Sequence, residues 1–352
     1  MKPVKLGIIG CGAIGTVHIR TAIKIPFFEL VAVADIVQEK AKKIAEEYKI
    51  KKYYSSGEKL LEDREIEAVI LAVTTNIRKD LAIKGFREGK NILLEKPPAM
   101  NAEEIYEMID ESKNLICGCC SSRFRFLDHS IFVTDFLKNQ PLGKLRVIRS
   151  KAILPPGPIP KQTPPAWRVS KSINGGGILA NWGVYDLDYL LGINDWKIKP
   201  KLVVGKTWEI PKQFSIYVAP NSDAEEHFAA FILCEEDVII IFERGECVPS
   251  QKEEIWQIVG EKGTLHLKMN VEKNKKIIYD DGKDVNKGIV SNIIWEGDED
   301  WEMIFKRQLE NFAKAVRGQE EIKTDLKKSL LIQKIIDAIY KSSENGKAIE
   351  IN

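Results

Sequence analysis

The sequence of 352 residues predicts an α/β protein of two domains, a doubly wound parallel sheet followed by an α+β domain built on a largely antiparallel open sheet. Apolar runs alternate with amphipathic segments up to about residue 120. Strand-like stretches then follow one another without intervening helices between residues 201 and 269. At roughly 150 residues per domain, the length also suits two domains. We therefore expect one domain over residues 1–122 and a second over residues 123–352.

The elements of the first domain follow from the spacing of apolar residues. Continuous apolar runs, typical of buried parallel strands, cover residues 4–10, 30–34, 68–73, 92–94 and 115–120. Amphipathic helices are expected over residues 13–25, 38–48, 77–88 and 102–112. Asn101 followed by Glu104 is typical of a helix N-terminus. Strict alternation of strand and helix predicts a parallel sheet.

The second domain begins with a different pattern. Residues 155–165 contain too many prolines for a helix or a central strand, so they form a loop. Strands are expected over residues 201–209, 226–234, 238–244, 254–260 and 263–269. Two helices close the chain, one marked by Trp301, Phe305, Leu309, Phe312 and Val316 and the other by Leu330, Ile332, Ile335, Ile336 and Ile339.

Composition excludes several classes of protein. The 53 Lys and Arg residues nearly balance the 51 Asp and Glu residues, and a net charge of +2 argues against a nucleic-acid partner. No apolar run reaches the roughly 18 residues that span a bilayer, so we expect a cytoplasmic protein with no membrane contact. We interpret Cys117, Cys119 and Cys120 as buried thiols, not as a redox or zinc site, and expect no metal.

A glycine-rich turn follows the first strand and opens the first helix. Glycine in this context allows a tight turn, a close approach of pyrophosphate and tight packing of helix on strand, as in the Rossmann dinucleotide-binding fold. The helix N-terminus offers N–H groups and a positive dipole end to phosphates. We expect the cofactor to contact Gly10, Gly12, Ala13, Ile14 and Gly15.

The cofactor preference is predicted by the end of the second strand. Asp35 lies 20 residues after Gly15 (35 − 15), where a carboxylate accepts hydrogen bonds from the ribose hydroxyls. It repels a 2′-phosphate, and Ile36 and Val37 supply no cation, which favours NAD over NADP. Lys40 is near enough in sequence to keep NADP open.

A second motif, Glu95-Lys96-Pro97-Pro98, ends the strand at residues 92–94. Ligands of open α/β sheets bind outside the carboxyl ends of the strands, so Lys96 is placed where a nicotinamide lies. Pro97 restricts the backbone of Lys96 and fixes its direction. A partly desolvated lysine beside a cation can exchange a proton. The alternative is an exposed strand-end lysine before a turn.

The third motif covers residues 175–188, where three glycines precede Ile-Leu-Ala-Asn-Trp-Gly-Val-Tyr-Asp-Leu-Asp. Asn181, Tyr185 and Asp188 fall at i, i+4 and i+7, so they share one stripe of a helix. Such a polar stripe is either a solvated face or a site.

These motifs, in this order, resemble the glucose-fructose oxidoreductase / inositol dehydrogenase / rhizopine catabolism (Gfo/Idh/MocA) family. The resemblance also includes residues 31–35, the segments EGKNILLEKPPA and SSRF, and the C-terminal IYKSSENGKAIEI. It implies a Rossmann domain and a C-terminal α+β domain whose open sheet forms a homodimer or homotetramer. It also implies oxidation or reduction of sugars, polyols and related carbonyl compounds with NAD(P).

The resemblance assigns roles to particular residues. Lys96 matches the catalytic lysine of the family, while Arg123 and Arg168 match positions that often line the active site. We also expect Thr74, Glu95, Lys96, Trp167 and Arg168 to contact the cofactor, and Lys96, Arg123, Arg168, Asn181, Tyr185 and Asp188 to contact the substrate.

Two positions depart from the common family pattern. Asn181 replaces an aspartate, and since an amide cannot take a proton, it can only orient a hydroxyl or carbonyl. Tyr185 replaces a histidine, as in the branch with glucose-fructose oxidoreductase and dihydrodiol dehydrogenase, where it serves as acid/base. We therefore expect Tyr185, assisted by Lys96, to exchange the hydroxyl proton.

Two other functions remain open at this point. One is a glycoside hydrolase or lyase that uses bound NAD for transient oxidation, and the other is a regulatory protein that binds the nucleotide without catalysis. The sequence does not identify the sugar or polyol, the direction of the reaction, or the choice between dimer and tetramer.

Overall fold

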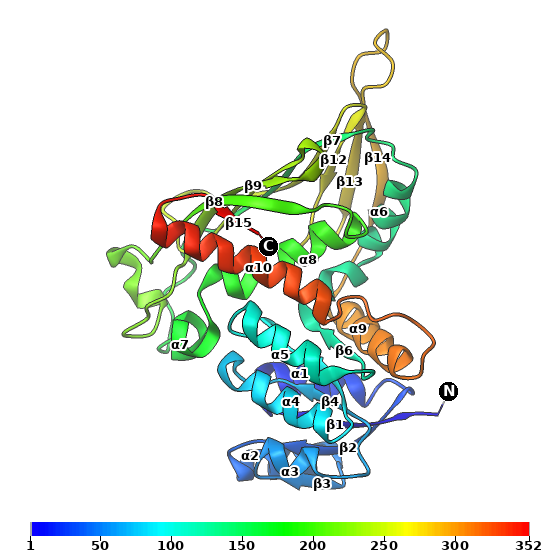
Figure 1. Ribbon diagram of the computed structural model, residues 1–352, viewed down its shortest axis with the longest axis vertical. Helices are drawn as coiled ribbons and strands as arrows, with labels where there is room; N and C mark the ends of the chain where they lie inside the picture. The colour runs from blue at the N-terminus through cyan, green and yellow to red at the C-terminus, as the bar shows by residue number, and fades with distance from the viewer. Residues whose placement is uncertain (1, 352) are drawn as a thin grey trace. The chain divides into compact units, whose positions relative to one another are not determined.

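Two units, each with its own sheet, make up the chain in the computed structural model, which describes residues 2–351. The first unit contains the chain up to Arg123 together with Trp301–Leu331, and the second contains Phe124–Asp300 and the chain from Ile332 onward. Each unit has helices and strands of its own, which are labelled in Figure 1.

A six-stranded sheet forms the centre of the first unit, in the order β3-β2-β1-β4-β5-β6. Each pairing in this sheet is parallel, as the alternation of strands and helices predicts. The order reverses between β1 and β4, which is the switch point where open α/β sheets bind ligands. The strands are β1 (Val4–Ile9), β2 (Phe28–Ala34), β3 (Lys52–Tyr54), β4 (Ala68–Leu71), β5 (Asn91–Leu94) and β6 (Cys117–Cys119).

The helices of the first unit cover this sheet and confirm most of the expected elements. They are α1 (Ala13–Ala22), α2 (Gln38–Tyr48), α3 (Gly57–Leu61), α4 (Arg78–Arg87) and α5 (Ala102–Ser112). The side chain of Asn101 accepts a hydrogen bond from the Glu104 N–H at 3.0 Å, which confirms the N-terminus predicted there. The short elements β3 and α3 were not expected, because three and five residues are too few to show a periodicity.

Helix α9 (Trp301–Val316) groups with the first unit, which differs from the expected second domain of residues 123–352. The apolar stripe of this helix is the reason. Leu309 and Phe312 are fully buried in the same core cluster as Ile19 of α1. Helix α10 (Leu326–Asn345) contributes residues to both units.

A nine-stranded sheet forms the centre of the second unit, in the order β14-β13-β12-β11-β7-β10-β9-β8-β15. It is largely antiparallel, as expected, with one parallel pair, β7 and β10. The strands are β7 (Leu145–Ile153), β8 (Pro200–Trp208), β9 (His227–Cys234), β10 (Ile239–Gly245), β11 (Glu253–Gly260), β12 (Gly263–Leu267), β13 (Lys275–Asp281), β14 (Val290–Gly297) and β15 (Ile349–Glu350). The strands β7, β13, β14 and β15 were not expected.

Helices cover one face of this second sheet. They are α6 (Asp128–Lys138), α8 (Val184–Ile193) and the later part of α10, and a π-helical segment (Leu179–Gly183) leads into α8. The short helix α7 (Lys171–Asn174) precedes the triple glycine. In Figure 1, α8 and the red α10 run beside the strands β8 and β9. Short 3₁₀ segments occur at Thr75–Ile77, Cys120–Phe126, Ala166–Val169, Lys212–Tyr217 and Glu235–Asp237. Within residues 2–351, no helix combines the length and the apolar character that crossing a membrane requires.

The core of the second unit also contains an ion-pair cluster. The Lys275 ammonium lies 2.5 Å from the Glu299 carboxylate, whose other oxygen lies 2.8 Å from Nδ1 of His129. Nε2 of His129 lies 2.9 Å from the Tyr189 hydroxyl. Burial lowers the pKa of Lys275, although Glu299 opposes the shift. Because these groups partner one another, each is stabilised in an interior where an unpaired charge is costly.

Candidate functional site

The glycine turn after β1 has the geometry of a dinucleotide-binding turn. Gly10 has φ of +97°, and a Cβ on Gly15 would lie 1.9 Å from the carbonyl oxygen of Gly10, so both positions require glycine. A Cβ on Gly12 would meet nothing within 4 Å. The backbone at Gly12 is therefore open to a ligand at the N-terminus of α1, where a pyrophosphate fits.

Asp35 follows β2 and lies beside the same turn. Its carboxylate accepts hydrogen bonds from the backbone N–H of Cys11 at 2.8 Å and of Val37 at 3.0 Å. These bonds fix the carboxylate next to the glycine turn and leave oxygen lone pairs for a ribose diol. The Lys40 ammonium lies 3.7 Å from Asp35, which neutralises part of its charge. The turn and the carboxylate together fit NAD.

Two further predicted residues lie at the same edge of the sheet. Thr74 follows β4, and its hydroxyl donates a hydrogen bond to the Asn76 side chain at 2.8 Å. Lys96 follows β5, the next strand in the sheet, and the Lys96–Pro97 peptide bond is cis. The carboxyl ends of β1, β4 and β5 therefore bring the glycine turn, Thr74 and Lys96 to one edge.

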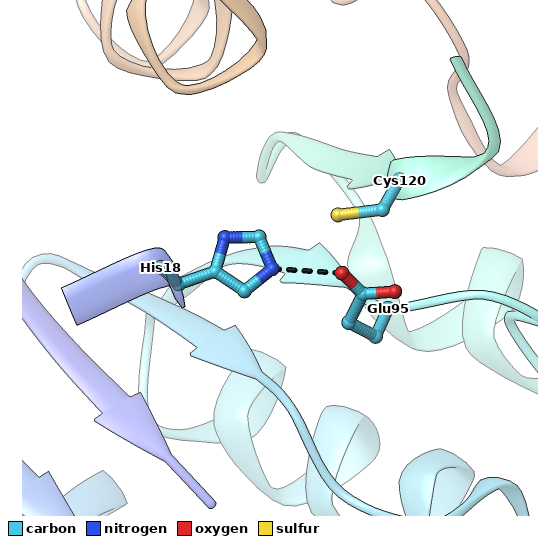
Figure 2. A group of neighbouring side chains, drawn as sticks. All are labelled: His18, Glu95 and Cys120. Carbon is cyan, nitrogen blue, oxygen red and sulfur yellow. Dashed lines mark hydrogen bonds and ion pairs between the residues drawn. The ribbon is translucent and has the colours of Figure 1, made fainter. Parts of the chain in front are cut away.

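Glu95, which directly precedes Lys96, lies at the centre of a buried ion-pair network. One carboxylate oxygen lies 2.8 Å from Nε2 of His18 (Figure 2) and 2.5 Å from a guanidinium nitrogen of Arg123. The other oxygen accepts a hydrogen bond from the Lys96 backbone N–H at 3.1 Å. Although burial opposes it, Arg123, with His18 and Lys96, holds the pKa of Glu95 well below its usual value. Glu95 is therefore an ionised carboxylate that fixes the backbone of Lys96.

Two side chains of α9 contact Arg123. Its guanidinium lies 4.1 Å from the ring centre of Phe305, and its Nε lies 3.3 Å from the Gln308 side-chain oxygen. The structure thus gives Arg123 partners inside the first unit, and its predicted contact with substrate stays a prediction.

Three donor groups of the kind that bind metals also meet at Glu95. Donor atoms of His18, Glu95 and Cys120 lie within 4.8 Å of one another (Figure 2). The Arg123 guanidinium already occupies Glu95, and burial raises the pKa of the Cys120 thiol well above its usual value. Since metals bind the thiolate and a guanidinium repels a cation, this group does not fit a metal centre. Cys117, Cys119 and Cys120 are free and buried, which confirms the burial expected for these thiols.

In the second unit, Asn181 lies in a π-helical segment, not in the regular α-helix that the i, i+4, i+7 spacing assumed. The segment covers Leu179–Gly183, and the Asn181 N–H donates to the Gly177 carbonyl at 2.9 Å. A π turn contains more residues than an α turn, so the predicted stripe does not continue in phase from Asn181 to Asp188. Single π turns inside helices are frequent at functional sites.

Tyr185 lies one turn further along, in an aromatic cluster. Its ring packs edge-on against Phe124 with centroids 5.0 Å apart and lies 5.5 Å from Trp182. Asn181 and Tyr185 are both buried, as is every residue of α8, so a solvated polar face is wrong. Asp188 is fully buried, and its carboxylate lies 2.8 Å from Nε of Arg125. Its role in substrate binding stays a prediction.

The predicted pair Trp167 and Arg168 lies in the 3₁₀ segment at Ala166–Val169. Trp167 is exposed, and Arg168 forms an ion pair with Glu246. The anionic partner of Arg168 is therefore a residue of the protein itself, Glu246. Their contacts with cofactor and substrate stay predictions.

Sequence reasoning missed several charged residues around these motifs. Asp186 accepts hydrogen bonds from Arg244 at 2.7 Å and from Trp256 at 2.8 Å. Glu225 binds the triple-glycine segment. The hydrogen-bond partners of the Asp186 and Glu225 carboxylates are 36 to 115 residues away along the chain, so no local pattern marks these residues.

Comparisons with known proteins agree with this geometry. A myo-inositol 2-dehydrogenase of Thermotoga maritima is 28% identical over 193 residues, 54% of this chain and 55% of that protein. A D-glucoside 3-dehydrogenase of Escherichia coli is 24% identical over 361 residues, 99% and 98% of the two chains. The solved structure of a levoglucosan dehydrogenase in complex with NADH and L-sorbose has a TM-score of 0.83 at 17% identity and full coverage of both chains, which shows a shared fold. The chain spans about half the length of several curated relatives that it matches.

Family profiles match the two halves of the chain separately. Residues 4–119 match the oxidoreductase-family NAD-binding Rossmann fold, and residues 135–351 match the C-terminal alpha/beta domain of the same family. Together with the glycine turn, Asp35 and the Glu95–Lys96 network, these matches establish that the chain belongs to the Gfo/Idh/MocA family of NAD-binding oxidoreductases.

Proposed function

We propose that the protein is an NAD-dependent dehydrogenase or reductase of a sugar, a polyol or a related carbonyl compound. The observation that carries this proposal is the placement of Lys96 at the carboxyl end of β5, at the same sheet edge as the glycine turn. The relatives named for myo-inositol, D-glucosides and levoglucosan support the substrate class.

In the proposed reaction, the cofactor exchanges the hydride, and side chains of the protein exchange the proton and orient the substrate. When bound, the nicotinamide exchanges a hydride with the carbon of a secondary alcohol. During oxidation the phenolate form of Tyr185 takes the alcohol proton and becomes the phenol, and during reduction the phenol gives that proton to the forming alkoxide, assisted by the Lys96 ammonium. The Asn181 amide orients the hydroxyl or carbonyl, since it exchanges no proton itself.

The ion pair of Arg168 favours a neutral substrate. Glu246 already neutralises the guanidinium, so an anionic substrate would have to displace a carboxylate to bind there. The named compounds of the three relatives carry no charge. We therefore propose a neutral polyhydroxylated substrate, with NAD favoured over NADP by Asp35.

The test is a turnover assay with myo-inositol, levoglucosan and a panel of D-glucosides, in which the absorbance of NADH is followed. Lys96→Met and Tyr185→Phe are each expected to lower kcat by about 100-fold or more, because general acid–base groups contribute that much. Lys59→Met, on the exposed surface of α3, is the matched control. Full turnover by Lys96→Met would contradict the mechanism.

The same assay distinguishes the two other functions. A hydrolase or lyase with transient oxidation would release product from a glycoside without net formation of NADH. A regulatory protein would bind NAD and turn over no member of the panel.

We also propose that two copies associate through the open face of the nine-stranded sheet. Val204, Phe231 and Ile241 are in register on adjacent strands and are 53%, 44% and 41% exposed, so they form an apolar patch. An Ile241→Asp variant is expected to sediment as a smaller species than the wild type. An unchanged sedimentation coefficient would exclude this face as the interface.

A further inference from the structure

One residue, Glu225, binds three consecutive backbone N–H groups where the triple-glycine segment enters its helix. The carboxylate accepts from Gly177 at 3.0 Å and from Leu179 at 2.9 Å. The backbone carbonyl of Glu225 accepts from Ile178 at 2.9 Å. The first N–H groups of a helix have no partners within the helix, so Glu225 satisfies three of them at once.

Tyr340 of α10 fixes this carboxylate from the other side. Its hydroxyl donates to the same oxygen that binds Leu179, at 2.8 Å. The carboxylate thus receives three donors, two N–H groups and one phenol, and all three favour its ionised form. Burial raises the pKa of Glu225, and these hydrogen bonds oppose the shift. Burial and Glu225 together raise the pKa of Tyr340 well above its usual value, so the phenol remains a donor.

The glycines explain how close this contact is. A Cβ on Gly176 would lie 1.9 Å from the Tyr340 hydroxyl oxygen, and a Cβ on Gly177 would lie 1.7 Å from the Glu225 carbonyl oxygen. Any side chain at either position would displace Tyr340 or Glu225. The triple glycine is therefore the surface against which Glu225 and Tyr340 pack.

The fixed segment leads directly to Asn181, to which we assign the orientation of the substrate, and to Tyr185, to which we assign proton transfer. Asn181 lies two positions after Leu179, and its N–H donates to the carbonyl of Gly177, one of the bound residues. Tyr185 follows in the first turn of α8. A π turn is a less regular geometry than an α turn, so its position depends on contacts from outside the helix.

We propose that Glu225, held by Tyr340, is the positioning residue that sets the placement of Asn181 and Tyr185 relative to the rest of the second unit. This inference rests on the proposed function, because it assumes that these two side chains act on the substrate. Glu225 touches no reacting atom. It acts through the backbone of Gly177, Ile178 and Leu179.

The experiment compares Glu225→Gln and Tyr340→Phe with the wild type on the panel sugar that is turned over fastest. Glutamine keeps the shape but presents an NH₂ group to one of the donors. A displacement of the order of 1 Å costs up to about 100-fold in rate, so we expect kcat to fall about 10- to 100-fold in Glu225→Gln. Tyr340→Phe keeps the hydrogen bonds from the Gly177 and Leu179 N–H groups to Glu225, so its kcat is expected to fall less than that of Glu225→Gln. The KM for NAD should remain within about twofold of the wild-type value in both variants, since the transition-state geometry is what changes.

Matched controls separate positioning from a general loss of structure. Tyr279→Phe removes a phenol hydrogen bond to the Pro141 carbonyl elsewhere in the second unit, and Glu235→Gln changes an exposed carboxylate. Both controls should keep the wild-type kcat. If Glu225→Gln does not fold, the kcat of the folded Tyr340→Phe variant, compared with that of Tyr279→Phe, tests the positioning role.

The outcomes distinguish failure of this inference from failure of the proposed function. A kcat within twofold of wild type for folded Glu225→Gln and Tyr340→Phe, together with an inactive Tyr185→Phe, would overturn the positioning role alone. Full activity of Tyr185→Phe would overturn the assignment of proton transfer to Tyr185, and a wild-type protein that turns over no sugar of the panel would overturn the proposed function itself. A fall in kcat for Tyr279→Phe as large as that for Tyr340→Phe would show that any lost phenol bond has this effect, and would also overturn the positioning role.

Discussion

Replacing Glu226 by glutamine should stabilise the protein at alkaline pH and leave it unchanged at acid pH. The residue is 4% exposed and lies next to the ion pair of Glu246 and Arg168. Burial, and then the charge of Glu246, raise the pKa of Glu226 to about 7 from an ordinary value of 4.5, while Arg168 opposes the shift. The ionised form of Glu226 is therefore disfavoured in the folded protein.

The magnitude follows from this shift. A rise of about 2.5 units at about 1.4 kcal/mol per unit gives about 3 kcal/mol. Between pH 4.5 and about 7 the folded state holds a proton that the unfolded state has released, so stability falls as pH rises through this window. Glutamine at position 226 does not titrate and loses no stability over that range.

The assay is urea unfolding followed by tryptophan fluorescence, at about pH 4 and about pH 8. The variant and the wild type should unfold at the same urea concentration at the lower pH. At the higher pH the variant should be more stable by about 3 kcal/mol. Glu235→Gln, an exposed carboxylate in the same unit, should show no such difference. If the advantage of Glu226→Gln does not grow between the two pH values, the reasoning from burial and Glu246 is refuted.

Three further predictions follow from single contacts. Gly177→Ala places a Cβ 1.7 Å from a backbone oxygen and should cost about 3 kcal/mol or more of stability in thermal unfolding, whereas Gly157→Ala, with open space around it, should unfold like the wild type. Lys275→Met leaves the Glu299 carboxylate without its closest cation and should cost about 3–5 kcal/mol, and an unchanged denaturation midpoint would contradict the buried ion pair. Asp35→Asn should lower kcat/KM with NAD about tenfold and with NADP less, so an equal loss with both cofactors would refute the assigned ribose contact.

The sequence predicted the first sheet closely because its signals are local. Continuous apolar runs mark strands that are buried on both faces, and the glycine turn and the Asn101 N-terminus are set by neighbouring residues. The second sheet was less evident. Strand β14 is exposed over most of its length, so it carries little of the alternation by which a half-buried strand is identified.

What the sequence by itself determined is the type of most elements and the motifs on which the proposed chemistry rests: the glycine turn, Asp35, Lys96, Asn181 and Tyr185. The physical reason is that periodicity and short motifs record which face is buried and where the backbone must turn.

Only the tertiary structure decided which groups meet. It placed α9 with the first unit and paired Arg123 with Glu95. It also formed the ion pair between Arg168 and Glu246, and it brought Tyr340 to Glu225 across 115 positions of the chain. Periodicity shows that a side chain faces inward but not which partner it meets there, because that partner is set by how distant segments pack.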